Sequence, residues 1–174
     1  MRGLNTPTSA VTVRRAVRDD GERIVELDRE LATFEKLRPP DDEEATRLLS
    51  WIFDTEKLES FVAELDGRVE GIALFYETPG STFRARPFLY LEDLVVSEAA
   101  RSRGVGEALM AALAKEAIKR NAWRIQWAVL DWNVRAIRFY DRLGAQQDDW
   151  LHYGLDEAGI RRVASGSRET SPGR

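Results

Sequence analysis

An apolar strand that runs into a glycine turn and then a helix is the feature that most constrains the fold of this chain. In residues 88–91, aromatic side chains alternate with leucines, and residues 94–96 are all apolar. This pattern predicts that residues 87–96 form a central strand covered on both faces. Residues 103–106 read Arg-Gly-Val-Gly, and residues 107–119 keep apolar side chains at helical spacing. Such a turn presents consecutive backbone N–H groups at the positive end of a helix. It therefore predicts either a site for a phosphate-bearing ligand or only a tight turn with close helix packing.

The remaining pattern predicts an α/β fold with a mixed sheet. Asp66-Gly67 separates two apolar segments and predicts a hairpin with a primed turn. Asp19 or Asp20 is suited to cap one helix, and Asp41 lies where a second helix begins. The expected strands are residues 11–14, 60–64, 69–76, 87–96, 124–129 and 150–155, and two further helices are expected over 107–119 and 133–143.

The length and the patterning indicate one domain. A chain of 174 residues is large enough to bury a core, and no internal repeat or long linker divides it. Residues 11–163 form the expected domain. Residues 1–10 and 164–174 are rich in Ser, Thr, Gly, Pro and Arg and are expected to be flexible tails. The polar start and the lack of an apolar stretch of ~20 residues favour a cytoplasmic protein without a membrane partner.

The composition restricts the chemistry. The chain has no cysteine and only one histidine, His152, so disulfides, thiolate zinc sites, a cysteine nucleophile and a His-based metal site are excluded. Metal binding by carboxylates alone stays open. The net charge of −4 argues against nucleic acid, whose phosphates require a basic surface. This charge is compatible with a cationic small substrate.

The glycine turn differs from two common phosphate sites and is similar to a third. It lacks the Lys and Ser/Thr of a P-loop and the third glycine of a dinucleotide fingerprint, which argues against nucleotide hydrolysis and hydride transfer. Residues 101–106, Arg-Ser-Arg-Gly-Val-Gly, resemble the R/Q-x-x-G-x-G/A signature with which the GNAT superfamily of N-acetyltransferases binds the pyrophosphate of acetyl-CoA. The strand before it and the helix after it match as well.

Further segments narrow the resemblance to one branch of that superfamily. They are Leu31-Ala32-x-x-Glu35, Tyr90-Leu91-Glu92-Asp93, Trp132-Asn133-x-x-Ala136-Ile137-x-Phe139-Tyr140 and Gly144-Ala145. These segments are similar to the spermidine/spermine (diamine) acetyltransferase and thialysine acetyltransferase branch. The resemblance implies a mixed, mostly antiparallel central sheet with helices on both faces, splayed at the fourth strand. It also implies a homodimer, acetyl-CoA as co-substrate, no metal, and direct attack by the amine in a ternary complex.

The resemblance assigns residues to acetyl-CoA. The strand segment supplies backbone groups to the pantetheine, the glycine turn binds the pyrophosphate, and a later helix adds further contacts. The implied cofactor-binding residues are Leu94, Val95, Val96, Arg101, Ser102, Arg103, Gly104, Val105, Gly106, Glu107, Asn133, Ala136 and Tyr140. For Asn133 the alternative is an ordinary N-cap of the helix that carries Tyr140, and both roles are compatible.

Glu92 and Tyr140 are the candidate catalytic residues. Glu92 lies within an apolar strand, where burying an ionised side chain without a purpose or a partner would be costly, and Asp93 is expected to point to the opposite face. The alternative is that Glu92 is paired with Arg84 or Arg86. By resemblance, Glu92 receives the proton of the attacking amine and Tyr140 protonates the departing thiolate. Without that resemblance, Tyr140 would be read as core packing.

The acceptor site implied by the resemblance is acidic. Glu35, Glu92 and Asp93, with Trp150, would line a negative groove with an aromatic wall suited to a polyamine or diamine. For Glu35 the alternative is a solvated residue at a helix end. Residues 36–38, Lys-Leu-Arg, place two cations beside this groove and depart from the polyamine pattern. A shorter acceptor with its own carboxylate, such as a thialysine-like amino acid, would tolerate them better.

The sequence therefore predicts an acetyl-CoA-dependent N-acetyltransferase acting on a primary amine of a small cationic acceptor. A protein amine or an aminoglycoside is the alternative acceptor. The alternative of a different class is an acyl-CoA-binding sensor that does not turn over.

Overall fold

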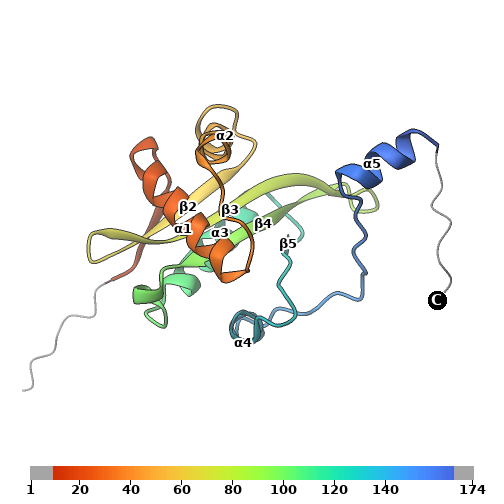
Figure 1. Cartoon of the computed structure of the whole chain (residues 1–174). Helices are drawn as coiled ribbons and strands as arrows, with labels where there is room; N and C mark the ends of the chain where they lie inside the picture. Colours follow the sequence, from red (N-terminus) through yellow and green to blue (C-terminus); the bar gives the residue numbers. More distant parts are fainter. Residues whose placement is uncertain (1–9, 167–174) are drawn as a thin grey trace, which may run out of the picture. The chain divides into compact units, whose positions relative to one another are not determined.

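The computed structural model describes residues 10–166 (Figure 1). The expected tails at residues 1–9 and 167–174 lie outside the described residues. The chain forms two compact units, one up to Ala128 and one from Val129, and each is described by itself. The single domain expected over residues 11–163 stays a prediction. No helix within the described range is long and apolar enough to cross a membrane.

The first unit is built on a five-stranded sheet. Its strands lie in chain order, and all neighbours are antiparallel except β4 and β5, which are parallel. The strands are β1 (Thr12–Arg15), β2 (Glu59–Leu65), β3 (Arg68–Ser81), β4 (Arg86–Val96) and β5 (Ile125–Gln126). Asp66 and Gly67 both have positive φ, 55° and 77°, which is the geometry of a type I′ hairpin turn. The expected mixed, mostly antiparallel sheet and its hairpin are confirmed.

Helices cover both faces of this sheet, as expected. The helices α1 (Gly21–Phe34) and α2 (Asp42–Phe53) pack on one face, and α3 (Val105–Lys119) lies on the other (Figure 1). Asp41 caps α2 in a capping box with Glu44, since each side chain accepts a hydrogen bond from the other's backbone N–H. Short 3-10 turns, η1 (Arg18–Asp20) and η2 (Glu98–Ala100), precede α1 and α3.

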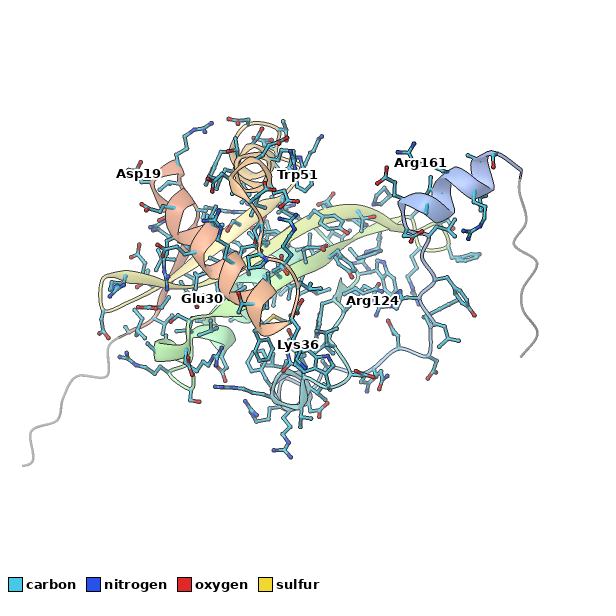
Figure 2. All side chains as sticks on the ribbon, in the orientation of Figure 1. Asp19, Glu30, Lys36, Trp51, Arg124 and Arg161 are labelled. Carbon is cyan, nitrogen blue, oxygen red and sulfur yellow. The ribbon has the colours of Figure 1, made fainter. Side chains whose placement is uncertain are left out.

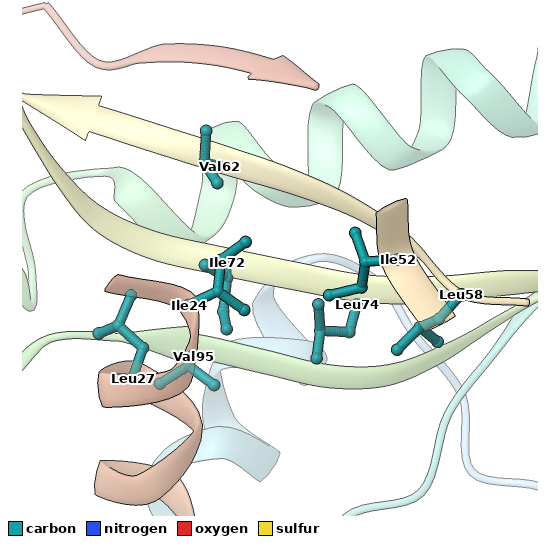
Figure 3. Packing of buried hydrophobic residues seen from close by; sticks show 8 residues of the cluster. All are labelled: Ile24, Leu27, Ile52, Leu58, Val62, Ile72, Leu74 and Val95. Atoms are coloured by element: carbon teal, nitrogen blue, oxygen red, sulfur yellow. The ribbon is translucent and has the colours of Figure 1, made fainter. Parts of the chain in front are cut away.

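The core between α1, α2 and the sheet is apolar and closely packed. Ile24 and Leu27 are three residues apart on α1, so they share the helix face that meets the sheet. Figure 3 shows them against Ile72 of β3 and Val95 of β4, in a cluster that also contains Leu74. Burying each such side chain stabilises the fold by roughly 1.5–3 kcal/mol. This core fixes α1 above β3 and β4.

The opposite face allows α3 to approach β3 very closely. A Cβ atom on Gly71 would lie 2.6 Å from Val105 Cγ1 and 3.1 Å from Leu109 Cδ1. Val105 and Leu109 are fully buried, so neither can move away without leaving the core. Glycine at position 71 therefore permits the packing that holds the start of α3 against the sheet.

A bulge interrupts β4 at Glu92. Asp93 pairs with Leu74 and Leu91 pairs with Phe75, so Glu92 is an extra residue that has no partner in β3. In the described part of the chain, β4 pairs with β5 at Leu89 and Tyr90 and not beyond them. The sheet therefore opens along β4 after Tyr90, which confirms the expected splay at the fourth strand.

The second unit contains two described helices, α4 (Val134–Arg142) and α5 (Glu157–Ala164). Helix α4 ends before Gly144, whose φ of 78° suits glycine, as the sequence predicted. The strand expected over residues 150–155 is wrong, because these residues form no regular element. Their aromatic and aliphatic side chains favour a strand only when a neighbouring strand accepts their hydrogen bonds, and the described residues of this unit include no such strand. The strand expected over 124–129 is shorter, covering only β5.

Candidate functional site

The bulge in β4 gathers carboxylates on the face of the sheet that carries α1. Leu91 lies opposite Phe75 on the α3 face, whereas Asp93 lies opposite Leu74 on the α1 face. Glu92 is the extra residue between them, and its charge raises the pKa of Asp93, Tyr76 and Tyr90, which places its side chain beside that of Asp93 on the α1 face. The expectation that Asp93 points away from Glu92 is therefore wrong, since it assumed an uninterrupted alternation.

Asp93 is the most strongly perturbed carboxyl group of this cluster. Its side chain is half-buried, and its pKa is raised from 3.8 to about 7. Burial is the largest cause, followed by the negative charges of Asp28, Glu92 and Glu35. Two of these carboxylates come from α1 and its C-cap, and one comes from β4. The acidic cluster therefore combines side chains of a helix and of the sheet that are distant in the sequence.

Asp28 and Glu35 contribute the α1 side of the cluster. They are seven residues apart, two helical turns, and therefore share one face of α1. Both side chains are half-buried, and burial raises the pKa of each. Glu35 is thus more than a solvated residue at a helix end. Sequence reasoning missed Asp28, although it lies four residues after buried Ile24, where the helical spacing calls for an apolar side chain.

Two tyrosines, also missed from the sequence, lie beside the carboxylates. Tyr76 of β3 pairs with Tyr90 of β4, and their ring centroids are 5.4 Å apart. Burial raises the pKa of both phenols, and the charge of Glu92 raises it further. Aromatic faces next to carboxylates favour a desolvated organic cation. The cluster therefore has the chemistry of a site for an amine in its ammonium form.

Glu92 itself is exposed rather than buried in the strand. Neither arginine considered as its partner is turned toward it: Arg86 bonds to Asn121, with 2.8 Å to Oδ1, and Arg84 lies over the Trp123 ring at 5.1 Å. Among the described residues, Glu92 forms no ion pair. Its charge is therefore available to an acceptor, and no arginine neutralises it.

The glycine turn forms an anion cradle at the start of α3. Gly104 is the N-cap residue with φ of 83°, and Ser102 also has a positive φ of 62°. The first hydrogen bond of α3 runs from Ala108 N to Gly104 O, so the earlier N–H groups of the helix point outward without helical partners. A Cβ atom on Gly104 would meet nothing within 4 Å, so the space beside this residue is open. This geometry suits a phosphate.

The predicted cofactor-binding residues play two different parts around this cradle. Val105 is 1% exposed and packs into the core, and Val95 is also buried, so these residues can offer only backbone groups to a ligand. The rest of the turn, including Arg101 and Glu107, is half-buried or exposed. Among the described residues, no strand pairs with 94–96 on the side opposite β3. The backbone of this segment is therefore open to an amide-bearing ligand.

The remaining predicted site residues belong to the second unit. Asn133 caps α4, since its Oδ1 accepts a hydrogen bond from Ala136 N at 3.1 Å, which confirms the N-cap role. Tyr140 is half-buried on α4, with its ring edge-on to Phe139 at 5.3 Å. Trp150 is 78% exposed in an irregular segment. Grouping Asn133, Tyr140 and Trp150 with the acidic cluster stays a prediction.

The chain is similar to known acetyltransferases. A family model described as the Acetyltransferase (GNAT) family matches residues 22–145. A thialysine N-epsilon-acetyltransferase of Bos taurus is 32% identical over 168 residues, covering 88% of this chain and 97% of that protein. An L-ornithine N5-acetyltransferase of Arabidopsis thaliana is 44% identical over 78 residues, 45% of this chain, and the match spans only 34% of that relative.

The solved structures support the same fold. An integron cassette protein from V. cholerae superposes with a TM-score of 0.76 at 24% identity, covering 88% of this chain and 97% of that one. No group of three or more His, Asp or Glu side chains within residues 10–166 is arranged to hold a metal ion.

The perturbed carboxyl of Asp93 has a consequence for stability. The folded protein keeps this proton up to about pH 7, whereas an unperturbed aspartate loses it near pH 3.8. The folded state therefore binds more protons in this window, and its stability falls as the pH rises from about 4 to about 7. Asp93→Asn removes this penalty. We expect its melting temperature to exceed that of the wild type by at least ~3 °C at pH 8, and the difference to vanish toward pH 4.

Differential scanning fluorimetry across this pH range measures the effect. Glu22→Gln, which removes an exposed carboxylate from α1, is the control and should follow the wild type. Parallel curves for Asp93→Asn and the wild type would show that Asp93 ionises normally.

Proposed function

The chain belongs to the GNAT family of acetyltransferases, and from this premise we propose that it transfers an acetyl group from acetyl-CoA to a primary amine of a small cationic acceptor. The observation that carries the proposal is the acidic cluster of Asp28, Glu35, Glu92 and Asp93. Four carboxylates beside two tyrosine rings would repel an anion and attract an ammonium group.

The acceptor's proton goes to Asp93. A primary amine with a pKa near ~10 is mostly protonated at neutral pH, so it must lose a proton before its nitrogen can attack. A base works best when its pKa lies near the working pH, and the pKa of Asp93 is about 7. We therefore exchange the roles assigned from the sequence: Asp93 accepts the proton, and exposed Glu92 holds the cationic acceptor.

The residues around the glycine turn are suited to acetyl-CoA. When bound, acetyl-CoA supplies the acetyl group as a thioester. The outward N–H groups at the start of α3 receive its pyrophosphate, and the open backbone of residues 94–96 pairs with its pantetheine amides. The open space in front of Gly104 supports this assignment, because any larger residue would intrude there.

Tyr140 donates a proton to the departing sulfur. A thiol has a pKa of about 8.5, so its thiolate leaves without much assistance and the phenol contributes less than the base does. Ala136 lies one turn and Asn133 two turns before Tyr140, at the start of α4, and both would contact acetyl-CoA. The likeness of this helix to the family segment supports these roles.

The acceptor carries a carboxylate of its own. Lys36 occupies the position after the C-cap of α1 with φ of 62°, where its N–H bonds to Thr33 O and the next N–H bonds to Ala32 O. Glycine is the usual residue in this motif, and a side chain there costs about 1–2 kcal/mol. Figure 2 shows Lys36 at this end of α1, directly after Glu35. Backbone strain of this kind is common at functional sites, which supports a role for Lys36 in acceptor binding.

An amino acid with a distal amine fits this arrangement. Its amine enters the acidic cluster, and its carboxylate meets the ammonium group of Lys36. Arg38, two residues further on, pairs with Glu44 and Asp41. The names of two relatives, a thialysine and an L-ornithine acetyltransferase, are consistent with such an acceptor. Polyamines lack the carboxylate and would gain nothing from Lys36.

The roles of the two β4 acids are separable by kinetics. Release of CoA from acetyl-CoA is followed with a thiol reagent, and the protein adds no background because it has no cysteine. For the wild type we expect kcat/KM to rise with pH through about 7, as Asp93 loses its proton. Asp93→Asn should lower kcat about 100-fold and remove this rise. Glu92→Gln should raise the acceptor KM about tenfold, ~1.4 kcal/mol, and keep the pH dependence.

The reverse pattern, with the pH dependence lost in Glu92→Gln and kept in Asp93→Asn, would return the base to Glu92. Tight acetyl-CoA binding without release of CoA for any lysine, ornithine, diamine, polyamine or aminoglycoside acceptor would contradict the proposed transfer.

The role of Lys36 is tested with acceptors that differ only by the carboxylate. Lysine is compared with cadaverine, and ornithine with putrescine. In the wild type we expect the amino acid of each pair to have the higher kcat/KM. Lys36→Gly should reduce that preference about tenfold, ~1.4 kcal/mol, while raising the melting temperature because glycine relieves the strain. Lys36→Arg should keep the preference, and Arg38→Gln should not change it. An unchanged preference in Lys36→Gly would remove Lys36 from acceptor selection.

A further inference from the structure

The turn that precedes α3 is anchored on the first residues of β3. At the end of β4, buried Ser97 donates a backbone hydrogen bond to Glu70 O at 2.8 Å, and its hydroxyl donates to the Glu70 carboxylate. Ser97 is the residue from which η2 begins, because its carbonyl accepts a hydrogen bond from Ala100 N. Glu70 of β3 therefore holds Ser97, the residue at which the chain leaves β4 and continues toward the glycine turn.

Glu70 is itself held in place. Its side chain is 14% exposed, and Arg23 of α1 approaches it at 3.5 Å while donating to Val69 O at 3.0 Å. Arg23 also pairs with Glu26 on its own helix. The Arg23 guanidinium and the Ser97 hydroxyl therefore both contact Oε2 of Glu70, and the two contacts together fix the orientation of the carboxylate.

Two more contacts attach the other end of the turn to the same hairpin. Val105, the first residue of α3, packs against Gly71, the neighbour of Glu70 in sequence. Within the turn, Arg103 pairs with Asp66 of the hairpin turn at 2.8 Å. The segment between Ser97 and Val105 is therefore held at both ends by residues 66–71, and Arg103 provides a contact between them.

We propose that Glu70 is a positioning residue for acyl-CoA binding, which acts through the Ser97 hydroxyl to hold the glycine turn in its anion-binding shape. This inference rests on the proposed function. The N–H groups of the cradle bind a phosphate well only if the positive φ values of Ser102 and Gly104 are maintained before the ligand arrives. Losing the anchor at Ser97 lets the turn sample other shapes, and the ligand must then restore the cradle when it binds.

The nature of the Glu70 side chain makes the proposal testable. Glutamine keeps an oxygen that can accept from Ser97 and loses the charge, whereas alanine loses both. We expect Glu70→Ala to raise the dissociation constant of CoA and the KM for acetyl-CoA about tenfold, with kcat and the acceptor KM within twofold of the wild type. Glu70→Gln should stay within threefold of the wild type. Ser97→Ala should raise the CoA dissociation constant about fivefold.

The matched control is Glu59→Ala. Glu59 is likewise a half-buried β-strand carboxylate, paired with Arg15 and Arg120, but it starts β2 and makes no contact with the glycine turn. Isothermal titration with CoA and melting curves are recorded for each variant. We expect Glu59→Ala to lower the melting temperature without changing the CoA dissociation constant.

The proposal would be overturned if Glu70→Ala lowered the melting temperature and left CoA binding unchanged, or if glutamine and alanine at position 70 weakened CoA binding equally. A wild-type protein that bound CoA but transferred no acetyl group would contradict only the proposed function. A wild-type protein that failed to bind CoA would contradict both.

Discussion

One extra residue in β4 determines where both parts of the candidate site lie. Before Glu92 the strand pairs with β3 and β5, and after it the edge opposite β3 is unpaired among the described residues. The same bulge turns Glu92 and Asp93 toward α1, where Asp28 and Glu35 lie. An uninterrupted strand would separate the two acids onto opposite faces. The acidic cluster and the open backbone edge therefore both follow from the bulge, which shifts the pairing register of β4 by one residue.

The acidic cluster lowers the stability of the folded protein, and packing elsewhere in the first unit compensates for this loss. Burying a carboxyl group near three others disfavours its ionised form and reduces stability above neutral pH. The apolar core around Ile24, Leu27 and Ile72 and the close packing of α3 on Gly71 hold the layers together in spite of it. Residues that lower the stability of the folded protein are common at functional sites. Lys36, with its left-handed backbone, is a second example.

Local signals in the sequence predicted most of the fold. The Asp66-Gly67 turn, the capping Asp41 and the glycine turn before α3 each depend on neighbouring residues alone, and all were found where expected. The bulge could not be read from the residues themselves, because alternation along residues 87–96 carries no mark of an inserted residue. Only the family resemblance implied that the sheet is splayed at the fourth strand. The error on Asp93 followed directly from the bulge. The strand predicted over residues 150–155 was wrong for a related reason, because a strand needs a partner strand and the segment itself does not specify one. Asp28 did leave a signal, a carboxylate within the apolar stripe of α1.

The most direct test of this account is the ionisation of Asp93. Protein labelled with ¹³C in aspartate is titrated between pH 3 and pH 9, and the Asp93 carboxyl resonance is assigned from the Asp93→Asn spectrum. We expect a midpoint of about 7, and a lower midpoint in Glu92→Gln, because that change removes one of the charges acting on Asp93. A midpoint near 4 that Glu92→Gln leaves unchanged would show that the carboxylates do not act on one another. The acidic cluster could not then supply the base.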